Sequence, residues 1–189
     1  AACGEGGVKP GWKSGVGGPA TVSLEEVVNH TDHICQLAGN VSERKYEKEG
    51  GPGLAACAEL IHRYSTQPAV DLRHLLRWVF FNLYVGNHDN HAKNMSIYSV
   101  PGQCATLTPF YDLMCTRLYP GLSREFALAI GGEARPGEMS AEHLALMARQ
   151  LGMQPRSLAQ QAAGVAAQLQ RAMALAVQVA DHVERPDLA

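Results

Sequence analysis

Residues 86–98 read Gly-Asn-His-Asp-Asn-His-Ala-Lys-Asn-Met-Ser-Ile-Tyr. This dense group of polar and ionisable side chains follows an apolar pattern of helical period and precedes an apolar pattern of strand period. Polar groups are costly to bury unless they are hydrogen-bonded or serve a chemical purpose. Residues 87–94, the polar loop, are therefore the segment most informative about both fold and function.

The spacing of two residues in the polar loop points to phosphoryl transfer. Asp89 and Asn94 are separated as are the aspartate and asparagine of the protein-kinase catalytic loop, H-R-D-x-x-x-x-N. That chemistry needs a carboxylate that accepts the proton of the attacking hydroxyl, and a neutral oxygen ligand for magnesium. Asp112 can supply a second magnesium ligand. It follows a strand pair, as the aspartate of a D-F-G turn does, although Leu113 and Met114 replace the phenylalanine and glycine.

Other interpretations of the same residues stay open. An isolated D-x-x-x-x-N pair occurs by chance and usually marks a solvated turn, and a single aspartate such as Asp112 is often a helix cap. His88, Asp89 and His91 could instead bind zinc or belong to a His-Asn-His nuclease site. Against zinc, adjacent positions cannot all point at one ion, and no cysteine or distant histidine is obviously placed to complete a tetrahedral site.

Three helices are predicted upstream of the polar loop. A capping box and apolar residues at helical spacing predict a helix over 24–37 that ends before Gly39. A glycine- and proline-rich run then precedes a second apolar stripe over 54–64. The third helix is expected to be capped by Asp71 and to run to Gly86.

The downstream half predicts a hairpin followed by two helices. Residues 95–98 and 105–108 have strand-like patterns on either side of a turn signal, and 126–130 could be a strand or a helix end. Ser140 caps a helix through Gln150, and Pro155 suits the first turn of a long final helix. The predicted fold class is α+β, predominantly α-helical, with a short β-hairpin between the two polar motifs.

Length and composition favour one globular domain with a leader. The chain has 189 residues, 46% hydrophobic and 18% charged, and a domain typically takes about 100–200 residues. Residues 1–22 are glycine-rich without apolar periodicity, so we expect a flexible leader before a domain at 23–189. The net charge of -2 provides no basic field for nucleic acid.

The cellular location is predicted from what the sequence lacks. No apolar stretch approaches the roughly 18 residues of a membrane span, and no secretory signal pattern is visible. The 5 cysteines contain no C-x-x-C pair, so we expect reduced thiols rather than a disulfide framework or a cysteine zinc site. A cytoplasmic protein that contacts neither membranes nor nucleic acid directly is therefore expected.

Two motifs resemble those of one enzyme family. G-N-H-D-N-H-A-K-N-M-S-I at 86–97 and L-T-P-F-Y-D-L at 107–113 are similar, in order and spacing, to the active-site motifs of HipA-family toxin kinases. Further similarity lies in K-Y-E followed by G-G-P-G at 45–53 and in L-A-I-G-G at 128–132. The resemblance covers most of residues 30–150.

The resemblance implies a role for each polar residue of the two motifs. Asp89 would be the catalytic base, and Asn94 and Asp112 would hold Mg²⁺. His91 and Lys93 would shape the loop or contact phosphate. The domain at 23–189 would then be the C-terminal lobe of a kinase-like fold.

The resemblance also implies a substrate and a partner. The whole protein would transfer phosphate from ATP to a serine or threonine hydroxyl of a protein, as the toxin of a bacterial toxin-antitoxin system, and a DNA-binding antitoxin would restrain it. The family's N-terminal lobe, which grips ATP, is not recognisable in this sequence, so the isolated chain is expected to be inactive. Two alternatives are a degenerate, non-catalytic module that binds an antitoxin, and a small-molecule kinase, because Asp89, His91 and Asn94 also resemble the D-x-H-x-x-N loop of aminoglycoside phosphotransferases.

Overall fold

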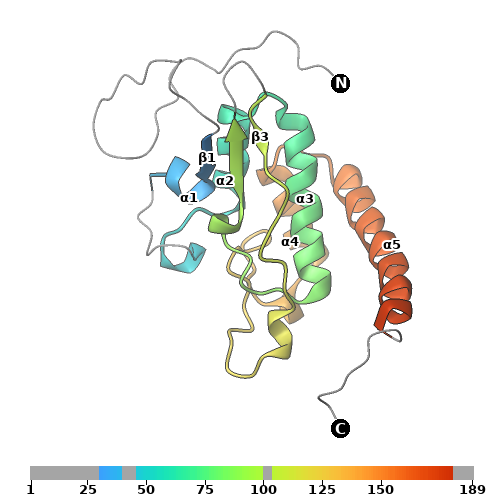
Figure 1. The fold of residues 1–189 in the computed structure, drawn as a ribbon. Coiled ribbons are helices and arrows are strands. Elements are labelled where there is room, and N and C mark those ends of the chain that lie inside the picture. Colours follow the sequence, from blue (N-terminus) through green and yellow to red (C-terminus); the bar gives the residue numbers. More distant parts are fainter. Residues whose placement is uncertain (1–29, 40–45, 100–103, 181–189) are drawn as a thin grey trace.

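A computed structural model describes residues 30–39, 46–99 and 104–180, and the predicted leader at 1–22 lies outside these ranges. Most of the described chain is helical, and a small antiparallel sheet lies beside the central helix, α3 (Pro68–Val85) (Figure 1). The predicted α+β class is therefore confirmed. The α-helices and β-strands are β1 (His30–His33), α1 (Ile34–Leu37), α2 (Leu54–Tyr64), α3 (Pro68–Val85), β2 (Ser96–Ser99), β3 (Thr106–Leu107), α4 (Ala141–Gln150) and α5 (Pro155–Ala180), and short 3₁₀ turns lie between them.

The sheet contains the predicted hairpin and one strand that was not predicted. Its order is β1-β2-β3, both pairs are antiparallel, and Ile97 lies opposite Leu107 in the hairpin. The prediction of a helix over 24–37 is wrong for residues 30–33, which form β1. Ile34–Leu37 is helical, and residues 24–29 lie outside the described residues. The four residues of β1 have no strand pattern of their own, so β1 forms because the free edge of β2 pairs with it.

The central helix α3 begins earlier than predicted. Pro68 occupies its first turn, where the missing N–H of proline does no harm. Asp71 is therefore not a helix cap. It is fully buried, and its carboxylate accepts hydrogen bonds from Ser65 Oγ (2.6 Å), Thr106 Oγ1 (2.9 Å) and the backbone N–H of Leu107 (3.1 Å). These bonds attach α3 to the hairpin.

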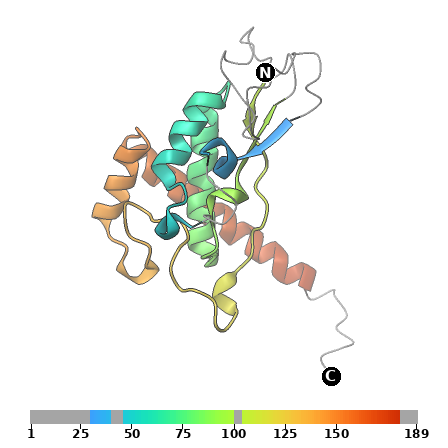
Figure 2. The same cartoon turned by 90° about the vertical axis from the view of Figure 1, so that its left-hand side faces the viewer.

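The two C-terminal helices follow the predicted bounds. The Ser140 hydroxyl accepts a hydrogen bond from the third residue of α4, as a cap should. The apolar stripe of α5 divides into two parts. Its first half packs against α3, with Val165 buried, whereas Met173 and Val177 are 67% and 61% exposed. Figure 2 shows the second half extending away from the rest of the molecule.

The core combines both halves of the chain. Residues 126–130 form no strand, but an isolated bridge joins Ile130 to Glu133, and Leu128 and Ile130 are fully buried.

No helix among the described residues is long and apolar enough to cross a membrane. Cys35 and Cys57 are free and buried, whereas Cys104 is disulfide-bonded. The expectation of reduced thiols is therefore wrong for Cys104, which is partly exposed.

Candidate active site

The polar loop begins where Gly86 ends α3. Gly86 has a φ of 72°, in the left-handed region that glycine adopts without strain. A Cβ at this position would lie 3.1 Å from Cβ of Arg117. The Gly86 carbonyl accepts hydrogen bonds from the N–H of Arg117 (3.0 Å) and from Thr116 Oγ1 (3.3 Å). The end of α3 is thus attached to the segment that follows Asp112.

Asn87 connects the two predicted motifs. Its side chain is buried, and its Nδ2 donates to Asn82 Oδ1 (2.8 Å) and to the carbonyl of Asp112 (3.2 Å). Its Oδ1 accepts from the N–H of Asp89 (3.2 Å). One amide group therefore holds the backbone of Asp89 close to the backbone of Asp112, although 22 residues lie between them in the sequence.

Asp89 and Asn94 are held to each other. The Nδ2 of Asn94 donates to the Asp89 carbonyl at 3.2 Å, across a short 3₁₀ turn that spans Ala92–Asn94. Asn94 is buried, whereas the side chain of Asp89 is 42% exposed. The Nδ2 of Asn94 is engaged in this hydrogen bond, whereas its Oδ1 has no hydrogen-bond partner among the described residues. The Oδ1 can therefore act as a ligand to a cation. Because the Asp89 side chain is partly exposed, a substrate hydroxyl can approach its carboxylate.

Asp112 is the one non-glycine residue of the described ranges with a positive φ, at 57°. Aspartate tolerates this left-handed conformation better than most residues, and such conformations are concentrated at functional sites. Its side chain is exposed, and within the part of the chain described here the carboxylate has no hydrogen-bond or ion-pair partner. The structure therefore presents an unengaged carboxylate beside the polar loop.

The two histidines of the loop face different surroundings. His91 is buried against Tyr46, with ring centroids 5.7 Å apart, and its Nε2 lies 3.9 Å from Asp89 Oδ2. The ring of His88 packs against Phe126, and its Nδ1 lies 3.3 Å from the carbonyl of Ser123. Among the described residues no group of three histidine, cysteine or acidic side chains could hold a metal ion. The zinc interpretation has no geometric support here.

Lys93 contributes to the loop through its backbone and its charge. Its carbonyl accepts a hydrogen bond from the hydroxyl of Tyr111 at 2.7 Å. Its charge lies close enough to Cys35 in α1 to offset part of the rise in the pKa of that thiol, which burial causes. Lys93 is thus fixed between α1 and the segment that carries Asp112, and its expected contact with phosphate stays a prediction.

Tyr111 is a site residue that the spacing of Asp89, Asn94 and Asp112 does not indicate. Besides the Lys93 carbonyl, its hydroxyl contacts Ser96 Oγ (2.9 Å) and His33 Nδ1 (3.0 Å). Burial raises the pKa of Tyr111, and the Ser96 hydroxyl partly counteracts that rise. One hydroxyl thereby joins β1, β2 and the end of the polar loop. Its position directly before Asp112 was the only sequence signal.

A second layer of hydrogen bonds, from backbone groups and the Glu47 side chain, supports the polar loop. The carbonyl of His88 accepts from the N–H of Ala127 at 2.9 Å. Glu47 Oε2 accepts from the N–H of Ala129 at 2.7 Å, and the N–H of Glu47 donates to the Ala127 carbonyl at 3.2 Å. Glu47 and Ala129, which lie in two further segments that resemble the family, therefore meet beside the polar loop.

The chain resembles two curated kinases over about two thirds of its length. A "Putative kinase Y4mE" from Sinorhizobium fredii is 41% identical over 124 residues, which cover 66% of this chain and 29% of that protein. The "Serine/threonine-protein kinase toxin HipA" of Shewanella oneidensis is 31% identical over 139 residues, which cover 68% of this chain and 32% of that protein.

A solved structure and a family match agree with these relatives. The structure of HipA from Shewanella oneidensis, in a complex with HipB and its operator DNA, superposes with a TM-score of 0.73 at 26% identity, over 85% of this chain and 39% of that one. The chain thus spans well under half the length of the proteins it matches. Residues 26–175 match the family described as HipA-like C-terminal domain. This chain therefore belongs to the HipA-like C-terminal domain family.

Proposed function

We propose that this chain is the lobe of a HipA-like serine/threonine kinase that carries the catalytic loop, and that the whole protein transfers phosphate from ATP to a protein hydroxyl. The observation that carries the proposal is the amide of Asn87, which binds the backbone of both Asp89 and Asp112. Phosphoryl transfer depends on positioning a base and metal ligands around one phosphate, so a rigid link between these two segments suits it.

Each predicted residue has a role in this proposal. The exposed carboxylate of Asp89 orients the substrate hydroxyl and accepts its proton, while His91, 3.9 Å away, limits the movement of that carboxylate. Asn94 Oδ1 and the carboxylate of Asp112 are oxygen donors of the kind that Mg²⁺ prefers, and neither has a competing partner among the described residues. Bound magnesium would supply positive charge beside the phosphates.

A kinase assay tests the catalytic assignment. Transfer from radiolabelled ATP is measured with the longest natural protein that contains this chain, as wild type and as Asp89→Asn. Loss of a general base typically lowers the rate by about 10²–10⁴-fold. Glu142→Gln, which removes an exposed carboxylate on α4, is the matched control and should be fully active. Asp89→Asn with wild-type activity would rule out the assignment.

The same assay separates the substrate classes. Under this proposal a protein serine or threonine is labelled and an aminoglycoside is not. The isolated chain of 189 residues should be inactive, because the groups that neutralise phosphate charge are typically worth about 2.7–4 kcal/mol each in the transition state and no phosphate-gripping motif is recognisable in it. Turnover by the isolated chain that depends on Asp89 would contradict that expectation.

Magnesium binding has a readout that does not need activity. Mn²⁺, a paramagnetic substitute for Mg²⁺, should broaden amide NMR signals near Asn94 and Asp112 in the isolated chain. Asp112→Gly, which removes the carboxylate and tolerates the φ of 57°, should remove the effect, and Glu142→Ala should keep it. Broadening that survives Asp112→Gly would place the metal elsewhere and remove Asp112 from the ligand set.

The exposed half of α5 favours a second candidate function, a non-catalytic module that binds a partner protein such as a DNA-binding antitoxin. Apolar side chains there, Met173, Leu175, Val177 and Val179, are 57–67% exposed. Such a module should retain its partner in a pull-down when Asp89 is replaced by asparagine, and should lose it with Val177→Glu. A pull-down that is insensitive to Val177→Glu would exclude this surface.

A further inference from the structure

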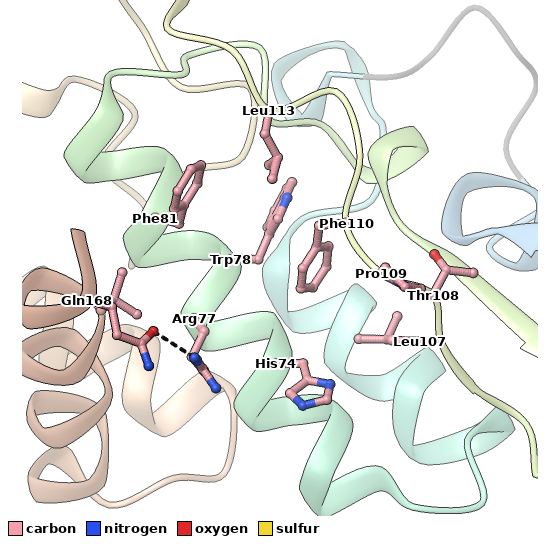
Figure 3. Close-up of a pocket in the computed structure, with 11 residues that line it drawn as sticks. His74, Arg77, Trp78, Phe81, Leu107, Thr108, Pro109, Phe110, Leu113 and Gln168 are labelled. Atoms are coloured by element: carbon pink, nitrogen blue, oxygen red, sulfur yellow. Dashed lines mark hydrogen bonds between the residues drawn. The ribbon is translucent and has the colours of Figure 1, made fainter. Parts of the chain in front are cut away.

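A cavity of about 410 Å³ lies between α3, α5 and the segment that leads from β3 to Asp112. Figure 3 shows the rings of Trp78, Phe81 and Phe110 with Leu113 toward one end, and His74 and Arg77 toward the other. Trp78 and Phe110 are stacked, with ring centroids 5.6 Å apart and an interplanar angle of 27°. Its size and mostly apolar, aromatic lining are those of small-molecule sites.

The charge of the cavity lining is positive. None of its residues is acidic, and Arg77 brings a fixed positive charge. Of the described residues, only Gln168 gives the Arg77 guanidinium a hydrogen-bond partner, at 2.8 Å across the rim (Figure 3). His74 lies beside Arg77, 3.9 Å from the buried carboxylate of Asp71. An arginine that has only a neutral partner at the mouth of an apolar cavity can pair with the anionic group of a ligand.

Two polar atoms of the cavity residues are also unsatisfied. Trp78 Nε1 and Thr108 Oγ1 are buried and have no hydrogen-bond partner among the described residues. Nearly all buried polar atoms in folded proteins are hydrogen-bonded, so each exception asks for an explanation. Because both atoms are almost completely buried, a ligand in the cavity would reach them only after a shift of the neighbouring side chains.

We propose that this cavity binds a small aromatic carboxylate. The aromatic body packs among Trp78, Phe81 and Phe110, and the carboxylate pairs with Arg77 at the rim. The cavity adjoins the candidate active site but is distinct from it, because Asp89, Asn94 and Asp112 are not among the residues that line it. The proposal therefore stands whether or not the chain is a kinase.

The test uses a matched pair of fluorescent probes on the isolated chain. 8-Anilinonaphthalene-1-sulfonate has an aromatic body and one anionic group, and N-phenyl-1-naphthylamine has the same body without the charge. The anionic probe should bind one site and accept energy from Trp78, about tenfold more tightly than the neutral probe. 1-Naphthylacetate should displace it, and 2-(1-naphthyl)ethanol should compete much less well.

Four single variants locate the bound probe. Arg77→Gln removes the charge, and Gln168→Glu places a carboxylate beside it. Each should weaken the anionic probe about tenfold and leave the neutral probe unchanged. The matched controls are Arg73→Gln on α3 and Gln170→Glu on α5, which make the same changes at exposed positions outside the lining and should bind as wild type.

Three results would overturn the proposal. They are equal affinity for the two probes, anionic binding that Arg77→Gln and Gln168→Glu leave unchanged, and absence of saturable binding. The second would mean that the probe sits on another apolar surface, such as the exposed half of α5. Circular dichroism and thermal unfolding of each variant verify that a loss of binding is not a loss of fold.

Discussion

Asp71 should be the carboxylate whose loss most destabilises this fold. Asp71→Ala removes the common acceptor of Ser65 Oγ, Thr106 Oγ1 and the N–H of Leu107. The two hydroxyls can rotate toward other acceptors, but the buried N–H of Leu107 cannot be redirected. An unsatisfied buried donor costs about 1–3 kcal/mol, and hydrogen bonds to a charged group contribute about 1.5–3 kcal/mol each without being additive. We expect a loss of about 3–5 kcal/mol.

That loss is large for a domain whose total stability is about 5–15 kcal/mol. Asp71→Asn keeps one acceptor oxygen in place, so its expected loss is only about 1–2 kcal/mol. Urea unfolding followed by circular dichroism measures both free energies of unfolding. Glu59→Ala, at an exposed position on α2, is the control and should stay within about 0.5 kcal/mol of wild type.

The outcome of the Asp71 comparison can refute the reasoning in two ways. If Asp71→Ala lost less than about 1 kcal/mol, α3 and the hairpin would be joined by apolar packing alone, without a contribution from this carboxylate. If Asp71→Asn were as destabilising as Asp71→Ala, the charge rather than the set of accepted hydrogen bonds would be responsible.

Three further predictions follow from single contacts. Tyr111→Phe removes three hydrogen bonds from a part-buried hydroxyl and should cost about 1–2 kcal/mol in urea unfolding, whereas Tyr119→Phe, whose hydroxyl has no partner among the described residues, should cost nothing measurable. The side chain and backbone N–H of Arg135 lower the pKa of Glu133 from 4.5 to about 2, so the stability it contributes is complete above pH 4.5 and is lost as pH falls toward 2. A carboxyl NMR titration should give that low midpoint, and Arg135→Gln should raise it; a wild-type midpoint near 4.5 would contradict the pairing. Gly131→Ala combines a φ of 58° with a Cβ that would overlap the backbone of α4, so its thermal midpoint should fall by several degrees, and an unchanged midpoint would contradict the close approach.

The parts of the fold that could be predicted rest on local signals. The left-handed glycine at Gly86, the Ser140 cap and the proline that opens α5 each act on the backbone within one turn. The hairpin was predictable because its two strand patterns alternate and lie close together in the sequence. Such features need no knowledge of which distant segments meet.

The features that were missed are tertiary. β1 is a strand because β2 offers it an edge, and Asp71 lies inside α3 because Pro68 starts that helix a turn earlier. In the candidate site, spacing and resemblance selected Asp89, Asn94 and Asp112. The connecting roles of Asn87 and Tyr111 could not be predicted, because they depend on contacts between segments that are distant in the sequence.

The shared amide of Asn87 also has a consequence for local opening. The N–H of Asp89 and the carbonyl of Asp112 are bound by the same side chain, so a fluctuation that withdraws that side chain releases both. The two loops then behave as one cooperative unit with a single opening free energy, rather than as two independent surface segments. In hydrogen exchange, the amide of Asp89 and the amides next to Asp112 would respond together to any ligand that contacts either loop.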